Sequence, residues 1–513
     1  MKLPKFRRTV SPSDVNLMIK EAIDWHQLLL FHIDKTPTRT PLRFKQIHAL
    51  FLTTGLAVHS HPFSRLLLLS SLPPVSSSLG GDLSYSISLL LHSPRPPSTF
   101  LSNTLISSLA TSGHHFLALS LFSTISTAPN SHTYPSLLKA CSNSSLLLPS
   151  GLALHAHLLK TLSFPLDPVV LTSLVFLHSR RGRHHACRHL FDQIPNPDLP
   201  AWNAILTCSA AKEVLSLFPS FQLSSSLPNE ITLLSLIVAC GDLSALTHGI
   251  WAHAYINRSS SSRRLLVCNH FLGAALIDMY SNCGRLDFAH QVFARLPQKD
   301  TFCYNAMMRG LATHGDGHGA LALFNEIIRE GIQPDEVTFL MAMSACSHAG
   351  LVDDGCRFFD RMEAEFGISP KLEHYGCLVG ILGRAGELKE ADKVMGRMPM
   401  EPNGMLLRAL LGAFRIHHRL KIDEKVMNML MELEPNNGEN YVLLSNIYAN
   451  FGKWDGAVQM RKKMRERGLG KRAGLSGVEI DGVVEEFVNG DQSHPQKKEI
   501  YEMIDQISRR FHD

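Results

Sequence analysis

The feature that most constrains this chain is a repeated pair of short amphipathic segments, clearest in residues 301–335. Apolar residues recur there at helical spacing, two glycines interrupt the pattern, and the spacing then resumes. Gly331 suits the left-handed position after a helix, and Pro334 stops that helix from continuing. Two helices of this size cannot bury their apolar stripes alone. The pattern therefore predicts a stack of similar hairpins along the chain.

The same pattern fills residues 336–371 and 372–403. With these residues the chain resembles the pentatricopeptide repeat (PPR) proteins of plant organelles, in the subfamily that alternates P-type, L-type and S-type units. The most specific matching stretches are residues 275–300, 340–355, 372–391 and 440–454. The resemblance implies an all-α superhelical solenoid of helix-turn-helix repeats, followed by a small C-terminal β-hairpin plus helix tail.

The repeat pattern predicts where each part of the chain begins and ends. Residues 1–40 form an N-terminal segment whose basic start, MKLPKFRRTV, permits a targeting peptide, and residues 41–98 hold degenerate repeats. Residues 404–471 resemble two E-type motifs, and residues 472–513 resemble an E+ tail. The complete repeat units between these parts are 99–130, 131–167, 168–198, 199–229, 230–269, 270–300, 301–335, 336–371 and 372–403.

The tail differs from the repeats. Strand-like alternation flanks Asp481 and Gly482, which is a strong signal for a two-residue hairpin turn. Residues 473–479, AGLSGVE, differ from the Pro-Gly-x-Ser-Trp signature of E+ regions at the proline and the tryptophan. A final amphipathic helix is marked by Ile500, Met503, Ile504, Ile507 and Phe511.

Charge distribution favours a polyanionic partner. The net charge is +5, but residues 41–190 contain ten Lys or Arg and only two acids, Asp82 and Asp167. An electropositive half suits the phosphate backbone of RNA, and the alternative is a serine-rich surface without a ligand. The ten cysteines show no CxxC pair, which predicts free thiols. No apolar run reaches the ~18 residues needed to cross a bilayer, so we expect no membrane contact.

The resemblance also implies which side chains read RNA. In these proteins one unit reads one base of single-stranded RNA, through the fifth residue of its first helix and the last residue of the unit. The alternative for each Asn at these positions is a helix-start residue that hydrogen-bonds its own backbone. The pairs with an implied preference are Asn305/Asp335 for uracil, Thr172/Asp198 for guanine, and Asn103/Asn130 and Asn203/Asn229 for a pyrimidine.

The remaining units have no assigned base. Read from residue 99 onward, the predicted RNA site is therefore pyrimidine, any, G, pyrimidine, any, any, U, any, any. The unassigned pairs are Pro135/Asp167, Leu234/Asn269, Ala274/Asp300, Leu340/Lys371 and Gly376/Asn403.

A basic cluster closes the second E-type motif. Its cations could hold phosphates beside the target nucleotide, and the alternative is a solvated helix face. The cluster consists of Arg461, Lys462, Lys463, Arg465 and Arg467, followed by Lys471 and Arg472.

We expect no catalysis in cis, no metal and no cofactor. A zinc deaminase needs a His-x-Glu string and a Pro-Cys-x-x-Cys string, and neither occurs before the chain ends at Asp513. His185 and His189 lie one helical turn apart, next to His184 and Cys187, but no second half of a zinc site is evident.

The resemblance implies a specificity factor for organellar C-to-U RNA editing. It would bind a single-stranded site and recruit a DYW-type deaminase protein in trans, with other editing factors and without DNA. One alternative is RNA stabilisation, splicing or translation by binding alone. Another is a peptide-binding helical scaffold, which the unequal unit lengths and the recurring fifth-position Asn disfavour. We expect the mitochondrion as its location, with the chloroplast as the alternative.

Overall fold

The computed structural model describes residues 98–124, 128–258, 270–416, 424–470 and most of 474–510. The predicted N-terminal segment and degenerate repeats therefore lie outside the described residues, apart from isolated positions. Outside them too are residues 259–268, together with Asn269, Lys471, Arg472 and Phe511. The chain divides into two compact units, residues 1–208 and residues 209–513.

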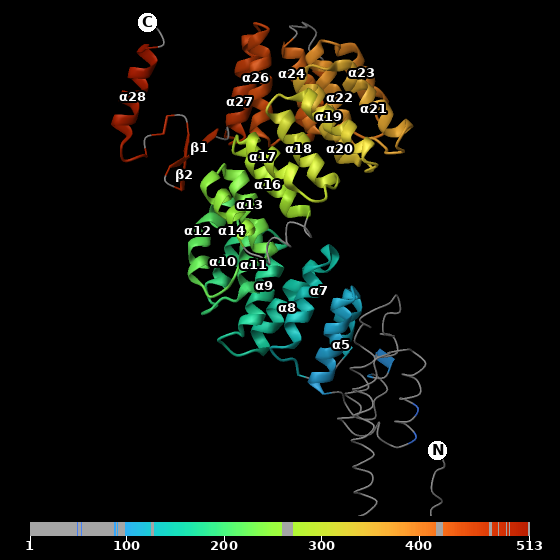
Figure 1. The fold of residues 1–513 in the computed structure, drawn as a ribbon, viewed down its shortest axis with the longest axis vertical. Helices are drawn as coiled ribbons and strands as arrows, with labels where there is room; N and C mark the ends of the chain where they lie inside the picture. The colour runs from blue at the N-terminus through green and yellow to red at the C-terminus, as the bar shows by residue number, and fades with distance from the viewer. Residues whose placement is uncertain are drawn as a thin grey trace, which may run out of the picture. The chain divides into compact units, whose positions relative to one another are not determined.

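The first unit consists of short helices in pairs (Figure 1). The first helix of each pair packs on the first helix of the next, so α5, α7, α9 and α11 contact one another in chain order. Each second helix packs on its own first helix. The described elements are α5 (Thr99–Thr111), α6 (His115–Thr124), α7 (Thr133–Ser142), η2 (Ser145–Leu147), α8 (Leu148–Thr161), α9 (Pro168–Ser179), α10 (His184–Phe191) and α11 (Leu199–Cys208).

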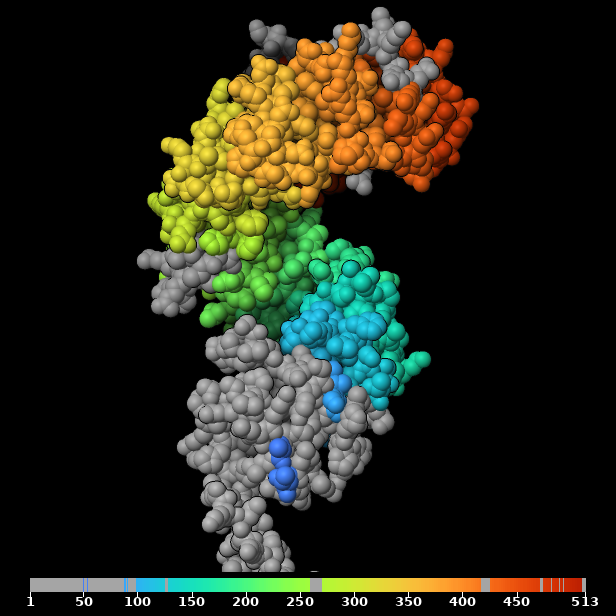
Figure 2. Space-filling view, turned by 90° about the vertical axis from the view of Figure 1, so that its right-hand side faces the viewer, coloured from blue at the N-terminus to red at the C-terminus, as the bar shows by residue number. Residues whose placement is uncertain are grey.

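The second unit continues the same arrangement, with α13, α16, α18, α20, α22 and α24 in successive contact. From α18 to α23, coloured yellow through orange, neighbouring repeats pack without a gap (Figure 2). Its helices are α12 (Ala211–Leu223), α13 (Glu230–Leu243), α14 (Leu246–Arg258), α16 (His270–Asn282), α17 (Leu286–Arg295), α18 (Thr301–Thr313), α19 (Gly317–Arg329), α20 (Glu336–Ala349), α21 (Val352–Ala364), α22 (Leu372–Ala385), α23 (Leu388–Arg397), α24 (Gly404–Ile416), α25 (Glu424–Leu433), α26 (Gly438–Asn450) and α27 (Trp454–Glu466).

Residues 301–335 show why the sequence folds into such pairs. Tyr304 and Met308 are buried on α18, Phe324 is fully buried on α19, and Gly331 takes the predicted left-handed conformation with φ 71°. The ring of Phe324 packs edge-on against Phe339 of the next repeat, with centroids 5.3 Å apart. Burying one such ring contributes about 2–3 kcal/mol, so adjacent repeats stabilise each other. The predicted all-α solenoid is confirmed.

The tail forms the predicted hairpin. Strands β1 (Leu475–Ile480) and β2 (Val483–Val488) are antiparallel, and Ile480 pairs with Val483 across a two-residue turn. Gly482 in that turn has φ 79°, which favours glycine. Helix α28 (Lys497–Arg510) follows. The prediction of a hairpin and a final helix is confirmed.

The hairpin contacts helices far away in the sequence. The Glu479 carboxylate accepts hydrogen bonds from the Thr247 N–H, at 3.1 and 3.2 Å, at the start of α14. The Lys212 ammonium on α12 lies 3.0 Å from the Glu486 carboxylate. A negative charge at a helix N-terminus is stabilising, so these contacts hold the hairpin against α12 and α14 of the second unit.

Nine cysteines fall within the described ranges, and each is a thiol rather than half of a disulfide. Burial raises the pKa of Cys141 to about 11 and that of Cys240 to about 12, so both thiols stay protonated at neutral pH. Among the helices that the structure describes, none is long and apolar enough to cross a bilayer.

Candidate nucleic-acid interface

The predicted uracil-reading pair is joined by a hydrogen bond. Asn305 on α18 is 6% exposed, and its Nδ2 donates to Asp335 Oδ1 at 3.1 Å. Asp335 is also the N-cap of α20, where the same carboxylate oxygen accepts from the Thr338 N–H at 2.8 Å. The Asp335 carboxylate thus caps the first helix of the next repeat and also orients the Asn305 amide of its own repeat.

The unit at residues 99–130 repeats this geometry with an amide in place of the carboxylate. Asn103 Nδ2 donates to Asn130 Oδ1 at 3.0 Å, and the same oxygen accepts from the His132 N–H at 3.1 Å. In both units the side-chain carbonyl oxygen of the fifth residue is buried and has no hydrogen-bond partner within the described chain. A buried acceptor without a donor is costly, and an imino N–H of a base is a donor of the kind it lacks.

The predicted guanine pair is not joined. The Thr172 hydroxyl donates to the Pro168 carbonyl oxygen at 2.9 Å, one turn earlier on α9. Asp198 accepts from the Ala201 N–H at 3.0 Å at the start of α11. The structure therefore shows two separate local contacts at this pair and no hydrogen bond between its members among the described residues.

The second pyrimidine pair is divided between the two compact units. Asn203 is 6% exposed on α11 in the first unit. Asn229 lies in the second unit, where it begins α13 with a capping box that includes Thr232. The structure places each residue at its expected position in its own unit.

Three of the five unassigned units keep the capping role, and all five lack a polar fifth residue. Their last residues Asp167, Asp300 and Asn403 cap the next first helix through side-chain oxygens at 2.8–3.0 Å from a backbone N–H. The helix-start alternative therefore applies to last residues, whereas Asn103 and Asn305 lie inside their helices. The fifth residues of the five unassigned units are Pro135, Leu234, Ala274, Leu340 and Gly376, none of which has a polar side chain.

A second row of side chains was missed by the sequence analysis. The second residue of most first helices is apolar and exposed, and residues 2 and 5 of a helix share one face. Phe271 and Phe302 lie in adjacent repeats with ring centroids 5.1 Å apart. The signal was an apolar residue at the second position of most first helices, although Pro200 and Glu373 interrupt the pattern. In the first unit the exposed apolar residues at this position are Phe100 and Val169, and in the second unit they are Ile231, Phe271, Phe302, Val337 and Met405, each 42–65% exposed.

These exposed apolar side chains suit the flat faces of unpaired bases. Base stacking on protein side chains is tolerant of sequence, whereas the neighbouring amides can discriminate between base edges. Three repeats combine an exposed apolar second residue with a polar fifth residue on one helix face: Phe100 with Asn103, Val169 with Thr172, and Phe302 with Asn305.

The predicted basic cluster is exposed on α27 and the residue that follows it. Two of its arginines bind within the protein: Arg461 Nε donates to Ser445 Oγ at 3.0 Å, and Arg467 Nη1 donates to the Pro435 carbonyl oxygen at 2.9 Å. Lys462 lies 3.8 Å from Glu466, which leaves Lys463 and Arg465 without a partner among the described residues. Because α27 is a second helix, the cluster does not lie on the same helices as the side chains at the second and fifth positions. Its contact with phosphates stays a prediction.

The histidine-rich segment at residues 184–189 is tied to nearby groups. His184 Nδ1 lies 2.6 Å from the Cys208 carbonyl oxygen, and the Cys187 thiol donates to the Val175 carbonyl oxygen. His189 Nδ1 lies 3.0 Å from Gln193 Nε2. Across the described ranges, no three His, Cys, Asp or Glu side chains gather in a way that could hold a metal ion.

Models of known protein families match most of the second unit. Models described as PPR repeat match residues 275–300, 337–365 and 373–401, and a PPR repeat family model matches 299–348. An E motif model matches residues 417–479, and an E+ motif model matches 484–511.

Similar curated proteins come from Arabidopsis thaliana. Pentatricopeptide repeat-containing protein At5g43790 is 42% identical over 451 residues, which cover 84% of this chain and 94% of that protein. Pentatricopeptide repeat-containing protein At5g56310 is 32% identical, covering 90% of this chain and 93% of the relative. Among solved structures, maize PPR10 in complex with an 18-nt psaJ RNA element aligns at 16% identity and a TM-score of 0.41, covering 84% of this chain and 73% of that one.

Proposed function

Because this chain belongs to the pentatricopeptide repeat family and carries E and E+ motifs, we propose that it selects sites for organellar C-to-U RNA editing. It binds single-stranded RNA by sequence and recruits a deaminase from another protein. The observation that carries the RNA-binding part is the Asn305 amide, held by Asp335 beside the exposed ring of Phe302.

The chemistry at Asn305 fits uracil. One Nδ2 hydrogen is used by Asp335, which leaves one N–H donor and the unpaired Oδ1 acceptor. Uracil offers the complement, a carbonyl oxygen next to an imino N–H, on its Watson–Crick edge. Phe302 supplies a stacking face for the same base.

The recruitment part rests on the tail. Every side chain of α28 from residue 497 to 509 is exposed, and the E+ motif match covers this helix. Ile500, Met503, Ile504 and Ile507 form one apolar face, each 41–56% exposed. An amphipathic helix with an uncovered apolar face is suited to docking in a groove of another protein. We propose that this partner is a DYW-type deaminase protein, and that the two proteins meet in the mitochondrion.

The base-reading part is tested by in vitro selection of RNA ligands with the purified full chain. We expect an enriched motif with U at its seventh position, and Asn305→Ser or Asp335→Asn should relax that position alone. Asp335→Asn is informative because Asn caps a helix about as well as Asp, so folding is preserved. Selection of no motif, or of one that both variants leave unchanged, would contradict the proposed reading.

The division of labour is tested by deleting residues 473–513. We expect RNA affinity to stay within about twofold, because the proposed RNA-contacting side chains lie on the repeats. Editing of the target cytidine in a complemented knockout should be lost. Loss of both activities, or of neither, contradicts the proposal. If cytidine editing stays normal in the knockout while transcript ends or splicing change, a binding-only role is supported instead. A fluorescent fusion of the full chain decides between mitochondrion and chloroplast.

A further inference from the structure

The hairpin α24–α25 keeps the layout of a reading unit although it follows the last predicted repeat. Met405, its second residue, is 65% exposed, and α24 packs on α22 as the first helices of the array do. Its fifth residue is Arg408, and the last residue of the unit is Asn437. The PPR repeat match ends at residue 401 and the E motif match begins at 417, so α24 lies between the two.

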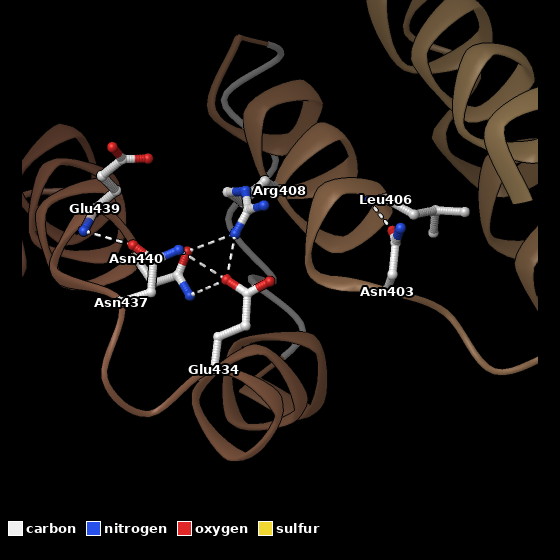
Figure 3. Close-up of polar contacts among 7 residues, drawn as sticks. All are labelled: Asn403, Leu406, Arg408, Glu434, Asn437, Glu439 and Asn440. Carbon is white, nitrogen blue, oxygen red and sulfur yellow. Dashed lines mark hydrogen bonds and ion pairs between the residues drawn. The ribbon is translucent and has the colours of Figure 1, made fainter. Parts of the chain in front are cut away.

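Arg408 is held in place by a polar network (Figure 3). Its Nη1 donates to Glu434 Oε2 at 2.6 Å and to Asn440 Oδ1 at 3.0 Å. Glu434 Oε2 also accepts from Asn437 Nδ2 at 2.8 Å and from Asn440 Nδ2 at 3.1 Å. These bonds, first that from Asn437, hold the pKa of the Glu434 carboxyl below its ordinary value, so it stays ionised and keeps Arg408 oriented.

The network replaces the arrangement seen at Asn305. In residues 301–335 the last residue of the unit orients the fifth. In the α24–α25 hairpin the last residue, Asn437, accepts from the Glu439 N–H at 3.1 Å and caps α26, while Glu434 orients Arg408 (Figure 3). Gly404 makes room for this, since a Cβ at that position would overlap the Glu434 carboxylate.

The network leaves part of the guanidinium free. Only Nη1 is used, so Nε–H and both Nη2 hydrogens have no partner in the part of the chain that the structure describes. The side chain is 31% exposed. A guanidinium donates in a planar fork and never accepts, so it matches a pair of acceptors. On RNA such pairs are the two non-bridging oxygens of a phosphate and the O6/N7 edge of guanine.

We propose that helices α24 and α25 form a tenth RNA-contacting unit, in which Arg408 donates to an acceptor pair on the nucleotide directly 3′ of the nine-base site. The inference rests on the proposed RNA binding and extends it toward the tail. Met405 lies beside that nucleotide as Phe302 lies beside the seventh.

The test measures the affinity of the purified full chain for 5′-UAGUAAUAA-3′, which satisfies the predicted site, and for the same RNA extended by A, C, G or U at its 3′ end. An extended RNA with a methylphosphonate at the added linkage is measured alongside. We expect the extension to strengthen binding about tenfold or more, and Arg408→Gln to remove this gain while leaving the nine-base affinity unchanged. A gain confined to G identifies the guanine edge; a gain for every base that the methylphosphonate abolishes identifies the phosphate.

Two variants separate recognition from folding. Arg408→Lys keeps a cation for Glu434 but lacks the planar fork, so it should melt like the unmodified chain and still lose the gain. Arg357→Gln removes a matched surface cation from the second helix α21 and should change nothing. Equal weakening of nine-base and extended RNAs by Arg408→Gln, or no weakening of either, overturns the inference alone. If the unmodified chain fails to bind the nine-base RNA, the proposed function falls and this inference with it.

Discussion

At the scale of single residues, the second position of each unit carries a testable share of RNA affinity. Replacing Phe302 with Ala removes one stacking face, which is worth about 1–3 kcal/mol per base. We expect the RNA affinity of this variant to fall roughly tenfold for every sequence. The preferred bases should be unchanged, because the fifth-position side chains such as Asn305 remain. Trp454→Ala is the control, since Trp454 is 67% exposed but lies on the second helix α27. If both variants lower the RNA affinity equally, any exposed aromatic side chain contributes to binding, and the second position has no special role.

A buried histidine pair gives the first unit a pH dependence. His178 on α9 is 4% exposed, and its Nε2 lies 3.1 Å from Nδ1 of His155 on α8. Burial, with smaller effects of His155, Arg183 and Arg181, lowers the pKa of His178 to about 4 from an ordinary 6.5. Burial lowers the pKa of His155 as well.

Between pH 4 and pH 6.5, His178 is protonated in the unfolded chain but not in the folded chain. The stability is therefore complete above about pH 6.5 and declines as the pH falls toward 4, by roughly 1–3 kcal/mol. Hydrogen exchange of α9 at pH 7 and pH 5 measures this loss, and we expect His178→Gln to reduce it. His185→Gln, at an exposed position on α10, should retain the full loss. An unchanged pH dependence in the His178 variant would assign the effect to other groups.

At the scale of elements, helix α22 offers two glycines with opposite expected effects. A Cβ at Gly383 would lie 2.6 Å from Ala413 Cβ on α24, so Gly383→Ala should push the helices apart and destabilise the stack by about 1–3 kcal/mol. Gly376 has no atom near its would-be Cβ, so Gly376→Ala should stabilise α22 by roughly 0.5–1 kcal/mol. Urea midpoints of the two variants measure this, and shifts of the same sign would contradict the packing of α22 on α24.

At the scale of the whole molecule, the tail breaks the rule that a solenoid repeat contacts only its neighbours. Glu479 contacts Thr247 across 232 residues of sequence and lies 3.8 Å from His248 Nδ1. We expect Glu479→Ala to speed exchange of the Thr247 amide about two- to fivefold, which corresponds to 0.3–1 kcal/mol for a charge at a helix N-terminus. Glu485→Ala, an exposed glutamate on the same hairpin, is the matched control and should leave that amide unchanged. Similar exchange in both variants would mean that the hairpin is held by other contacts.

The sequence by itself determined the features that are local. Helical spacing and glycine positions are set within one unit, so the paired helices, the left-handed Gly331 and the hairpin turn at Gly482 were predictable. The pairing of Asn305 with Asp335 was implied by the resemblance to PPR proteins, and the two side chains are hydrogen-bonded in the structure.

Only the tertiary structure decided which side chains are exposed and which distant groups meet. Phe302 and Phe324 are the same residue type in one repeat, yet the first is 52% exposed and the second is fully buried, since burial depends on what packs above each helix face. The contacts Arg408–Glu434 and Glu479–Thr247 have no local signature in the sequence. They form because helix packing brings a carboxylate to a donor, and an ion pair or cap depends on distance in space rather than on spacing along the chain.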